Sequence, residues 1–154
     1  MNVRDYTPAD AKAFHDLNMA WVSKYFTVEA EDRAQLEDPQ TYILDKGGAI
    51  LIADYDGEAV GTVGLVPGHG EGVLELIKMS ARSDIQGKGI GRALMDAAVE
   101  KSREMGAKQI WLETNTSLEA ALALYRKSGF RELTGDELTP TPYDRCNCQM
   151  LLDL

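Results

Sequence analysis

One stretch of the sequence is rich in glycine and basic residues: Gln86-Gly87-Lys88-Gly89-Ile90-Gly91-Arg92. It lies between a predicted strand and the start of a predicted helix. Glycine lets backbone N–H groups approach a ligand closely, and the first turn of a helix leaves several N–H groups without an intrahelical partner. Together with the helix dipole and the charges of Lys88 and Arg92, these donors predict a site for an anion such as a phosphate. The same residues would also suit a flexible turn that only caps the helix.

The glycine-rich turn does not match two common phosphate-binding motifs. In the Walker pattern GxxxxGK[ST], Ser or Thr follows the lysine, whereas Gly89 follows Lys88. The dinucleotide pattern GxGxxG also fails. Gly89 is followed by Ile90, Gly91, Arg92 and Ala93, so Arg92 stands where the pattern requires its third glycine. A protein that binds ATP through this turn is therefore disfavoured.

Periodic apolar residues predict the elements that position the turn. Val73–Met79 is a predicted strand, Ser80–Gly91 the loop that contains the turn, and a helix follows to about Met105. Gln109–Glu113 is the next predicted strand. Thr116 and Glu119 have the spacing of a capping box, which predicts the start of another helix. The apolar faces of these two helices consist of Ile90, Leu94, Ala97 and Ala98, and of Leu118, Ala121, Leu122 and Tyr125.

The rest of the chain predicts further strands and helices in a mixed order. Asp56-Gly57 predicts a hairpin between strands Ala49–Asp54 and Ala59–Val66. The order β-α-α-β-β-β-α-β-α-β-β predicts one α/β (α+β) domain over residues 1–154. Its sheet would be mixed and mostly antiparallel, with a parallel β-α-β unit and about four flanking helices. The remaining predicted elements are a strand at Asn2–Tyr6, a helix after Thr7, a polar helix at Glu29–Glu37, and strands at Phe130–Leu133 and Arg145–Leu152.

Composition and charge exclude several classes of protein. With 154 residues, 44% of them hydrophobic and 27% charged, the chain suits one soluble globular domain. The net charge of −9 disfavours nucleic acid and anionic membranes as partners. Cys146 and Cys148, with two histidines, fall short of a zinc site, so no metal is expected. The N-terminal residues contain no apolar stretch of the kind a signal peptide needs, so we expect no secretory signal and a reduced, cytoplasmic protein.

Two motifs resemble one family. Gln86-x-x-Gly89-x-Gly91 is similar to the Q/R-x-x-G-x-G/A signature of the GNAT superfamily of N-acyltransferases, whose loop binds the pyrophosphate of acetyl-CoA. Leu124-Tyr125-Arg126-Lys127-Ser128-Gly129-Phe130 resembles that family's second signature, a Leu-Tyr pair followed by Gly-Phe. The order of the predicted elements also agrees over essentially the whole chain. Each motif alone is weakly specific, whereas both at the expected separation indicate this family.

The resemblance implies acetyl-CoA as the co-substrate. A splayed strand at Lys78–Ala81 would pair its exposed backbone with the pantetheine arm, and the N–H of Met79 would stabilise the oxyanion. The glycine-rich turn would hold the pyrophosphate. The implied acetyl-CoA contacts are Met79, Ser80, Ala81, Gln86, Gly87, Lys88, Gly89, Ile90, Gly91, Arg92, Asn115 and Tyr125. Many relatives have an asparagine where this chain has Leu118, and Asn115 could take over that contact or be an ordinary turn residue.

The resemblance also implies the catalytic groups. Tyr125 occupies the position of the family's usual general acid, although its helical spacing would also suit a core tyrosine. Glu75 lies where many relatives place the carboxylate that takes the amine's proton, directly or through water. Burial among Leu74, Leu76 and Ile77 would raise its pKa towards useful basicity, whereas a solvent-facing Glu75 would have no such role. Glu113 is a second candidate for the base.

The acceptor is expected between the first helices and the last strands. Tyr25, Phe26 and Glu29 would form an aromatic wall with a carboxylate, which suits an amine. Arg145 and Asn147, with Gln149, would share one face of the last strand and could bind a substrate carboxylate. Helix packing and a solvated strand face are the plain alternatives for these two groups. The histidines, His15 and His69, are assigned no role.

Two functions remain open at this point. The first is an N-acetyltransferase that transfers the acetyl group of acetyl-CoA to a primary amine of a small molecule, amino acid or peptide, by direct attack in a ternary complex. The second is a non-catalytic sensor or interaction module that binds acyl-CoA. Pairing through the last strand would favour a homodimer.

Overall fold

The computed structural model describes residues 1–85 and 87–154, and Gln86 lies outside the described residues. Within these ranges, seven strands form one sheet in the order β1-β2-β3-β4-β5-β7-β6. The β4–β5 pair is parallel and the other pairs are antiparallel. The sheet therefore confirms the predicted fold class. The strands are β1 (Asn2–Asp5), β2 (Ala49–Tyr55), β3 (Glu58–Pro67), β4 (Val73–Ala81), β5 (Gln109–Thr114), β6 (Arg131–Glu132) and β7 (Cys148–Asp153).

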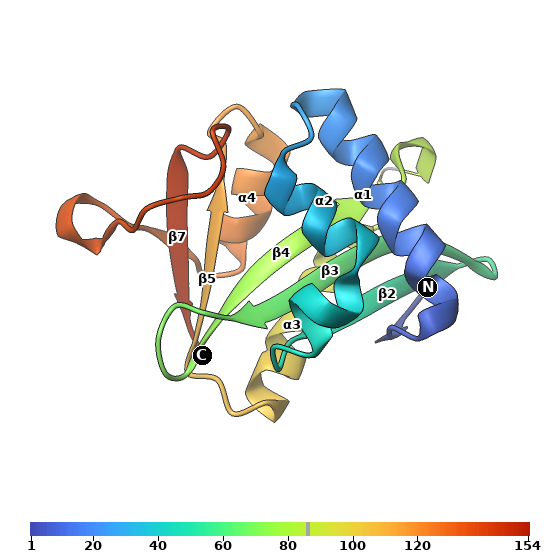
Figure 1. Ribbon diagram of the computed structural model, residues 1–154, viewed down its shortest axis with the longest axis horizontal. Coiled ribbons are helices and arrows are strands. Elements are labelled where there is room, and N and C mark those ends of the chain that lie inside the picture. Colours follow the sequence, from blue (N-terminus) through green and yellow to red (C-terminus); the bar gives the residue numbers. More distant parts are fainter. Residues whose placement is uncertain (86) are drawn as a thin grey trace.

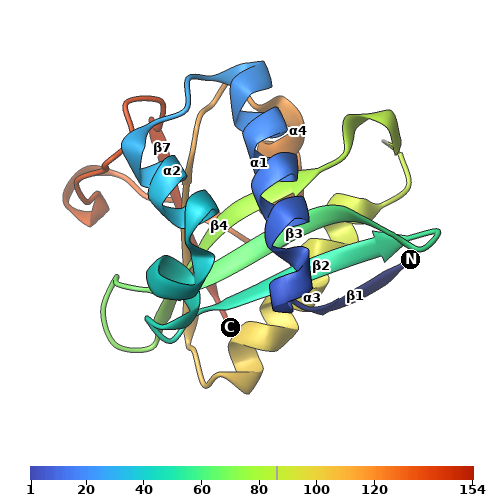
Figure 2. The same ribbon diagram turned by 45° about the vertical axis from the view of Figure 1, so that its right-hand side comes forward.

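Helices cover both faces of the sheet. α1 (Ala11–Tyr25) and α2 (Ala30–Glu37) lie on one face, and α3 (Ile90–Glu104) and α4 (Glu119–Lys127) lie on the other (Figure 1). Figure 2 shows α1 crossing β3 and β4, with α2 beside it. A short π-helical turn at Gln40–Leu44 follows α2 and was not predicted. Among the described residues, no helix combines the length and the apolar character needed to cross a membrane.

Each face of the sheet has its own hydrophobic core. The larger core packs α3 and α4 against the sheet, and Leu94, Met95 and Ala98 in it are fully buried. The smaller core lies under α1 and α2 and includes Phe14 and Leu36. The apolar spacing that predicted the α3 face is confirmed, since a helix that must cover a sheet buries residues three and four positions apart.

The predicted capping box at Thr116 and Glu119 is wrong. The N-cap residue of α4 is Leu118. The backbone N–H groups of Thr116 and Ser117 donate instead to the side chains of Asn147 (2.9 Å) and Asn115 (2.8 Å). Two asparagine side chains therefore bind the N–H groups that precede the helix.

The last strand also differs from its prediction. β7 begins at Cys148 rather than at Arg145, because Arg145 turns towards α2 and Asn147 binds Thr116. β7 also lies between β5 and β6, with Met150 and Leu151 paired to β6. The edge of β7 that faces away from β5 is thus paired with β6 at these residues. A second copy of the chain could not pair with β7 there, which weakens the expectation of a homodimer through the last strand.

Candidate active site

The sheet opens between β4 and β5. The two strands pair in parallel from Val73–Gln109 to Glu75–Trp111, and beyond Glu75 their described residues diverge (Figure 1). β4 continues along β3 to Ala81, two residues beyond its predicted end, and β5 continues along β7 to Thr114. The expected splay is present and begins before Lys78. It leaves the inner edges of both strands available to other groups.

A bulge in β4 changes which side chains face this opening. The register with β3 passes from Gly64–Ile77 to Thr62–Ser80, so two residues of β4, Lys78 and Met79, lie opposite Val63. Lys78 has the left-handed φ of 50° that such a bulge can require. Ile77 packs under α1 and α2, and Lys78 reaches the same side to contact α2. Without the extra residue, Lys78 would face the apolar core under α3.

Buried polar side chains support the bulge. The Thr62 hydroxyl donates to the backbone carbonyl of Lys78 (2.8 Å) and accepts from the Asn18 amide (2.9 Å). Asn18 also donates to the carbonyl of Phe14 in α1. Thr62 and Asn18 are almost fully buried, so these bonds are shielded from water. The network fixes the bulge relative to α1, because a buried polar group left unpaired costs free energy.

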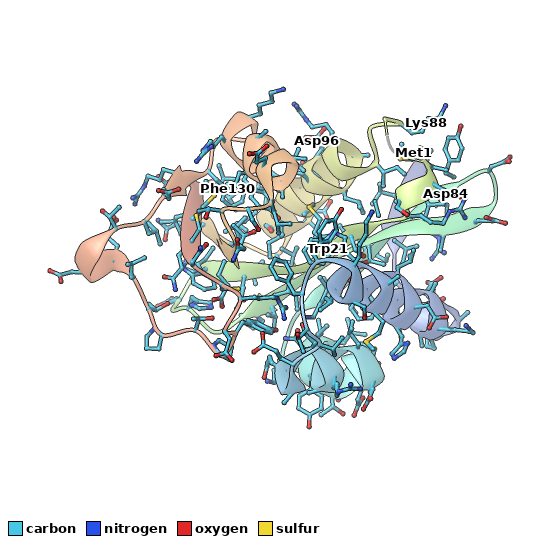
Figure 3. All side chains as sticks on the ribbon, turned by 90° about the horizontal axis from the view of Figure 1, so that it is seen from above. Met1, Trp21, Asp84, Lys88, Asp96 and Phe130 are labelled. Atoms are coloured by element: carbon cyan, nitrogen blue, oxygen red, sulfur yellow. The ribbon has the colours of Figure 1, made fainter. Side chains whose placement is uncertain are left out.

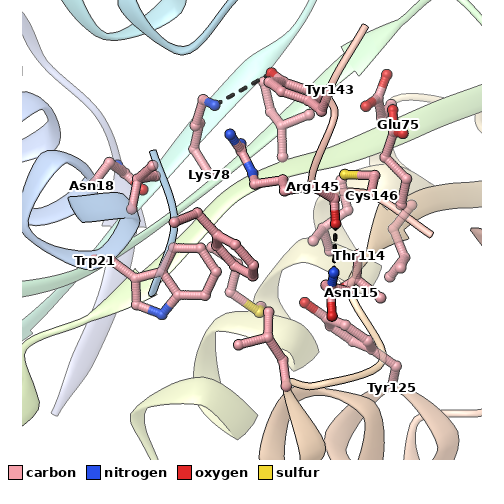
Figure 4. A pocket seen from close by; sticks show the side chains of 18 residues that line it. Asn18, Trp21, Glu75, Lys78, Thr114, Asn115, Tyr125, Tyr143, Arg145 and Cys146 are labelled. Atoms are coloured by element: carbon pink, nitrogen blue, oxygen red, sulfur yellow. Dashed lines mark hydrogen bonds between the residues drawn. The ribbon is translucent and has the colours of Figure 1, made fainter. Parts of the chain in front are cut away.

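A cavity lies in the opening between β4 and β5 (Figure 4). Several predicted site residues line it, including Glu75, Met79, Asn115, Tyr125 and Arg145. Figure 4 shows Glu75 and Tyr125 at opposite sides, with Cys146 and Asn115 between them in this view. The other lining residues are Asn18, Trp21, Val22, Phe26, Leu76, Ile77, Lys78, Leu112, Glu113, Thr114, Leu118, Tyr143 and Cys146.

Glu75 is largely buried, as one of the two sequence interpretations requires. Its side chain is 17% exposed, and its Oε1 lies 2.8 Å from Nε2 of His69. Burial raises the pKa of Glu75, and the contact with His69 opposes that rise. His69 stacks on Trp111, with ring centroids 3.8 Å apart. Glu75 is therefore a shielded carboxylate with one ordered partner, which suits a group that accepts a proton near neutral pH.

Glu113 lies on the same face of the sheet as Glu75. Glu75 pairs with Trp111 across the two strands, and Glu113 is two residues further along β5. Its Oε1 is buried and makes no hydrogen bond to the described residues. Burial raises the pKa of Glu113, and it also raises the pKa of the neighbouring Cys146 thiol to about 12. A neutral thiol and two carboxylates thus border the same part of the cavity.

Tyr125 reaches the cavity from α4. Its side chain is buried, and its ring packs against Phe130 at a centroid distance of 5.9 Å. Burial raises the pKa of Tyr125 to about 12. The phenol therefore keeps its proton at neutral pH and can donate it.

An ion cluster borders the cavity beneath α2. The fully buried Asp32 accepts hydrogen bonds from Lys78 (2.6 Å) and, through both of its oxygens, from Arg145 (2.7 and 2.8 Å). Burial alone would raise the pKa of Asp32, but the bond from Arg145 and the charge of Lys78 lower it to about 2. The Tyr143 ring lies 4.2 Å from the Arg145 guanidinium, and its hydroxyl accepts from Lys78 (3.4 Å). Asp32 thus stays ionised and holds both cations.

The predicted acceptor residues separate in the structure. Phe26 lines the cavity, whereas Tyr25 is 44% exposed and lines a neighbouring groove. Glu29 binds Arg145 (3.2 Å), so the two charges compensate each other. The expected polar face of Arg145, Asn147 and Gln149 is wrong, because only Gln149 belongs to β7. It is buried and binds the backbone of Thr139.

Asn115 has both ends of its amide engaged. Its Nδ2 donates to the carbonyl of Arg145 (2.7 Å), and its Oδ1 accepts from the N–H of Ser117 (2.8 Å). It therefore ties the segment before β7 to the turn before α4. Its contact with acetyl-CoA stays a prediction.

The glycine-rich turn precedes α3 as expected, and its Gln86 lies outside the described residues. Gly89 is the N-cap of α3 with a φ of 75°, a conformation that residues with a Cβ rarely adopt. Gly87, Lys88 and Arg92 are exposed, whereas Ile90 is buried in the core. Arg92 pairs with Asp96 one turn further on (3.1 Å). The N–H groups of the first turn of α3 thus begin at the surface, where an anion could reach them.

A groove of about 660 Å³ adjoins the cavity and shares Trp21 and Leu118 with it. Its walls come from α1, from the first turn of α4 and from the end of β4 at Ala81. Figure 3 looks onto this side, with Trp21 on α1 and Lys88 at the turn before α3. The volume lies within the range of sites for small molecules. The described residues hold no group of three or more His, Cys, Asp or Glu side chains placed to bind a metal.

Sequence reasoning missed several residues of the site. Asp32 belongs to a helix in which four of the eight residues are charged, so its local sequence does not single it out as buried. Lys78 interrupts an apolar strand, and His69 lies between glycines, two signals that could have been followed. The partners of Asp32 are 46 and 113 residues away in the chain, beyond the reach of local patterns.

Comparisons with known proteins agree with this geometry. A model of the Acetyltransferase (GNAT) family matches residues 13–130. An uncharacterized N-acetyltransferase of Escherichia coli strain K12, YjgM, is 38% identical over 110 residues, which cover 70% of this chain and 65% of that protein. The chain spans about half to two thirds of the length of the curated relatives it matches.

Solved structures share the fold over nearly the whole chain. An acetyltransferase of the GNAT family from Staphylococcus aureus Mu50 has a TM-score of 0.87 and 22% identity, and the match covers 99% of this chain and 98% of that one. The PaiA N-acetyltransferase of Thermoplasma acidophilum, solved with coenzyme A, has a TM-score of 0.76 and 16% identity, with 99% and 98% covered. At these identities, the likeness shows the fold.

Proposed function

Because the chain belongs to the acetyltransferase (GNAT) family, we propose that it is an N-acetyltransferase that transfers the acetyl group of acetyl-CoA to a primary amine. The acceptor would be a small molecule, an amino acid or a peptide. The observation that carries this proposal is the opening between β4 and β5, where Glu75, Met79 and Tyr125 border one cavity. A proton acceptor, a backbone donor and a proton donor are the groups that acyl transfer from a thioester to an amine requires.

In this proposal the amine attacks directly in a ternary complex. Glu75 accepts a proton from the acceptor ammonium and leaves the nitrogen lone pair free to attack the thioester carbonyl. The N–H of Met79, in the bulge opposite Val63, donates to the oxyanion that forms. Tyr125 donates its phenolic proton to the departing thiolate. As the amide forms, the nitrogen loses its second proton, which restores the Tyr125 phenol, and Glu75 releases its proton to solvent. The products are an amide, free thiol and one proton.

The other end of acetyl-CoA would lie along the groove beside the cavity. The groove has the volume for an extended arm, and Ala81 at its wall ends the part of β4 that diverges from β5. The pyrophosphate would bind at the turn before α3, where Gly87, Gly89 and the first helical N–H groups face solvent. Arg92 and Lys88 add positive charge there.

Charge in the cavity supports a cationic acceptor. Lys78 and Arg145 are already paired with Asp32, and Arg145 also with Glu29. Glu75 and Glu113 are therefore the charged groups left to face a ligand. Cationic amines should react faster than neutral ones, and added salt should reduce that preference. Glu113 remains the alternative base, since it borders the same cavity.

A panel of amines, read by the release of free thiol from acetyl-CoA, tests the proposal. The wild type, Tyr125→Phe, Glu75→Gln and Glu113→Gln are compared side by side. Thiol release with at least one amine, and its reduction in Tyr125→Phe and in one of the two glutamate variants, supports the enzyme and identifies the base. Tight binding of acetyl-CoA in calorimetry without thiol release across the panel would contradict it and support a sensor.

A further inference from the structure

His69 lies at the junction between the cavity and the protein surface. It belongs to the loop between β3 and β4, where Gly68 and Gly70 on either side have φ values of 144° and 104°. Its side chain is 22% exposed and also lines a surface groove together with Trp111. The ring is thus partly open to solvent, while its Nε2 contacts Oε1 of Glu75. The imidazole therefore connects the Glu75 carboxylate to the surface groove.

Two contacts fix the orientation of this imidazole. The ring stacks on Trp111 at 3.8 Å with an interplanar angle of 23°, and Trp111 is 4% exposed. Trp111 is the residue of β5 that pairs with Glu75 of β4. Trp111, on which His69 stacks, therefore lies directly across the strand pair from Glu75, which His69 contacts. This arrangement is built across three segments of the chain, the β3–β4 loop, β4 and β5.

We propose that His69 is a positioning residue that holds Glu75 in its ionised, proton-accepting form, with the Nε2–H donating to Oε1 so that Oε2 faces the acceptor amine. This inference rests on the proposed function, in which Glu75 takes the amine's proton. An ionised carboxylate can only accept hydrogen bonds, so Nε2 carries the proton in this pair. This hydrogen bond fixes the position of Oε1 and leaves Oε2 to accept the proton of the amine.

The surroundings of Glu75 explain why such a partner is needed. Burial favours the neutral acid, and the negative charge of Glu113 acts in the same direction. Lys78 acts in the opposite direction, but its charge is shared with Asp32 and its amine also bonds the Tyr143 hydroxyl. The other titratable groups at the cavity are Arg145, which Asp32 and Glu29 hold, and Cys146, Tyr125 and Tyr143, whose pKa values burial raises so that they stay neutral. Among the described residues, the contact with His69 is the hydrogen bond that this carboxylate makes.

Two substitutions of His69 separate the hydrogen bond from the packing. His69→Phe keeps a flat ring that can stack on Trp111 but removes the donor. His69→Gln keeps an N–H donor but removes the ring. We expect His69→Phe to shift the acidic limb of the kcat/KM profile to higher pH by about one to two units, the size of a charge-assisted hydrogen bond. His69→Gln should restore at least half of that shift.

The pH profiles have two outcomes that would overturn the proposal. If His69→Phe keeps the wild-type acidic limb, the hydrogen bond has no effect on the ionisation of Glu75. If His69→Phe loses activity equally at every pH, His69 acts in another way, as a base or as part of the folded frame. Thermal unfolding and acetyl-CoA binding of each variant show whether the frame is intact.

A second measurement does not depend on activity. The chain has two histidines, so ¹⁵N-histidine labelling gives signals from His15 and His69, and the His69→Phe variant assigns them. Glu75→Gln should move the ring nitrogen signals of His69 and leave those of His15, which contacts Asp16, unchanged. Unmoved His69 signals would refute the pairing itself. A paired His69 in a protein that releases no thiol with any amine would instead contradict the proposed function.

Discussion

Replacing Asp32 by alanine should destabilise the fold more than any other single loss of a carboxylate in the chain. Asp32 is fully buried, and its partners Lys78 and Arg145 have side chains only 6% and 14% exposed. The alanine variant leaves two cations under α2 without their shared anion. It also removes the Oδ2 atom that accepts a hydrogen bond (2.9 Å) from the backbone N–H of Glu29, the N-cap residue of α2.

The size of the loss follows from these contacts. Breaking a buried ion pair by removing one partner costs about 3–5 kcal/mol, because the remaining charge stays buried without compensation. We therefore expect the free energy of unfolding to fall by about 4 kcal/mol and Tm by about 8–16 °C, at about 2–4 °C per kcal/mol for a chain of this size. Asp32→Asn keeps the shape and the acceptor for Glu29, and should lose slightly less.

Part of this stability depends on pH. The pKa of Asp32 is lowered from 3.8 to about 2 in the folded state. A lowered folded-state pKa contributes stability that is fully present above pH 3.8 and is lost as pH falls towards 2. The shift is equivalent to about 2 kcal/mol. The difference in unfolding free energy between the wild type and Asp32→Asn should therefore narrow by about that amount between pH 4 and pH 2.

Urea unfolding followed by circular dichroism, at neutral pH and at several pH values below 4, measures both effects. Asp96→Ala is the matched control, because Asp96 pairs with Arg92 one turn away at the surface, with side chains 66% and 61% exposed. Such exposed pairs contribute little, so this variant should unfold like the wild type. If Asp32→Ala is no less stable than Asp96→Ala, the ion cluster does not support the fold and the reasoning is wrong.

Three further substitutions test other parts of the site. Tyr125→Phe should lower kcat for thiol release about 100-fold, as expected for the loss of a general acid, and leave the Kd for acetyl-CoA in calorimetry unchanged. A kcat near that of the wild type would show that Tyr125 is not the general acid. Gly89→Ala should cost about 1–2 kcal/mol, because its φ of 75° is unfavourable for alanine, and should weaken acetyl-CoA binding. An unchanged Tm and Kd would show that the turn adapts. Thr62→Val leaves the Asn18 amide and the Lys78 carbonyl without their shared hydroxyl. The free energy of unfolding in urea should fall by about 2 kcal/mol, and kcat should fall because the bulge in β4 loses its support. A variant as stable as the wild type would mean that water replaces the hydroxyl.

Local patterns in the sequence predicted most of the regular structure. The spacing of Ile90, Leu94 and Ala98 predicted the buried face of α3, and Asp56-Gly57 predicted the β2–β3 hairpin, where both residues have positive φ values. Such features depend on residues that are neighbours in the chain. Prediction failed where distant side chains replaced a local signal, as at Thr116, whose backbone N–H binds Asn147.

The sequence by itself determined the mixed sheet, the turn before α3 and the two motifs that place Tyr125 and Gly89 in the chain. The tertiary structure decided which charged groups meet. One extra residue in β4 turns Lys78 towards α2, where Asp32 holds it together with Arg145. A charge becomes stable in the interior only where its partners converge, and that convergence depends on strand register and helix packing, which side-chain periodicity along the chain does not encode.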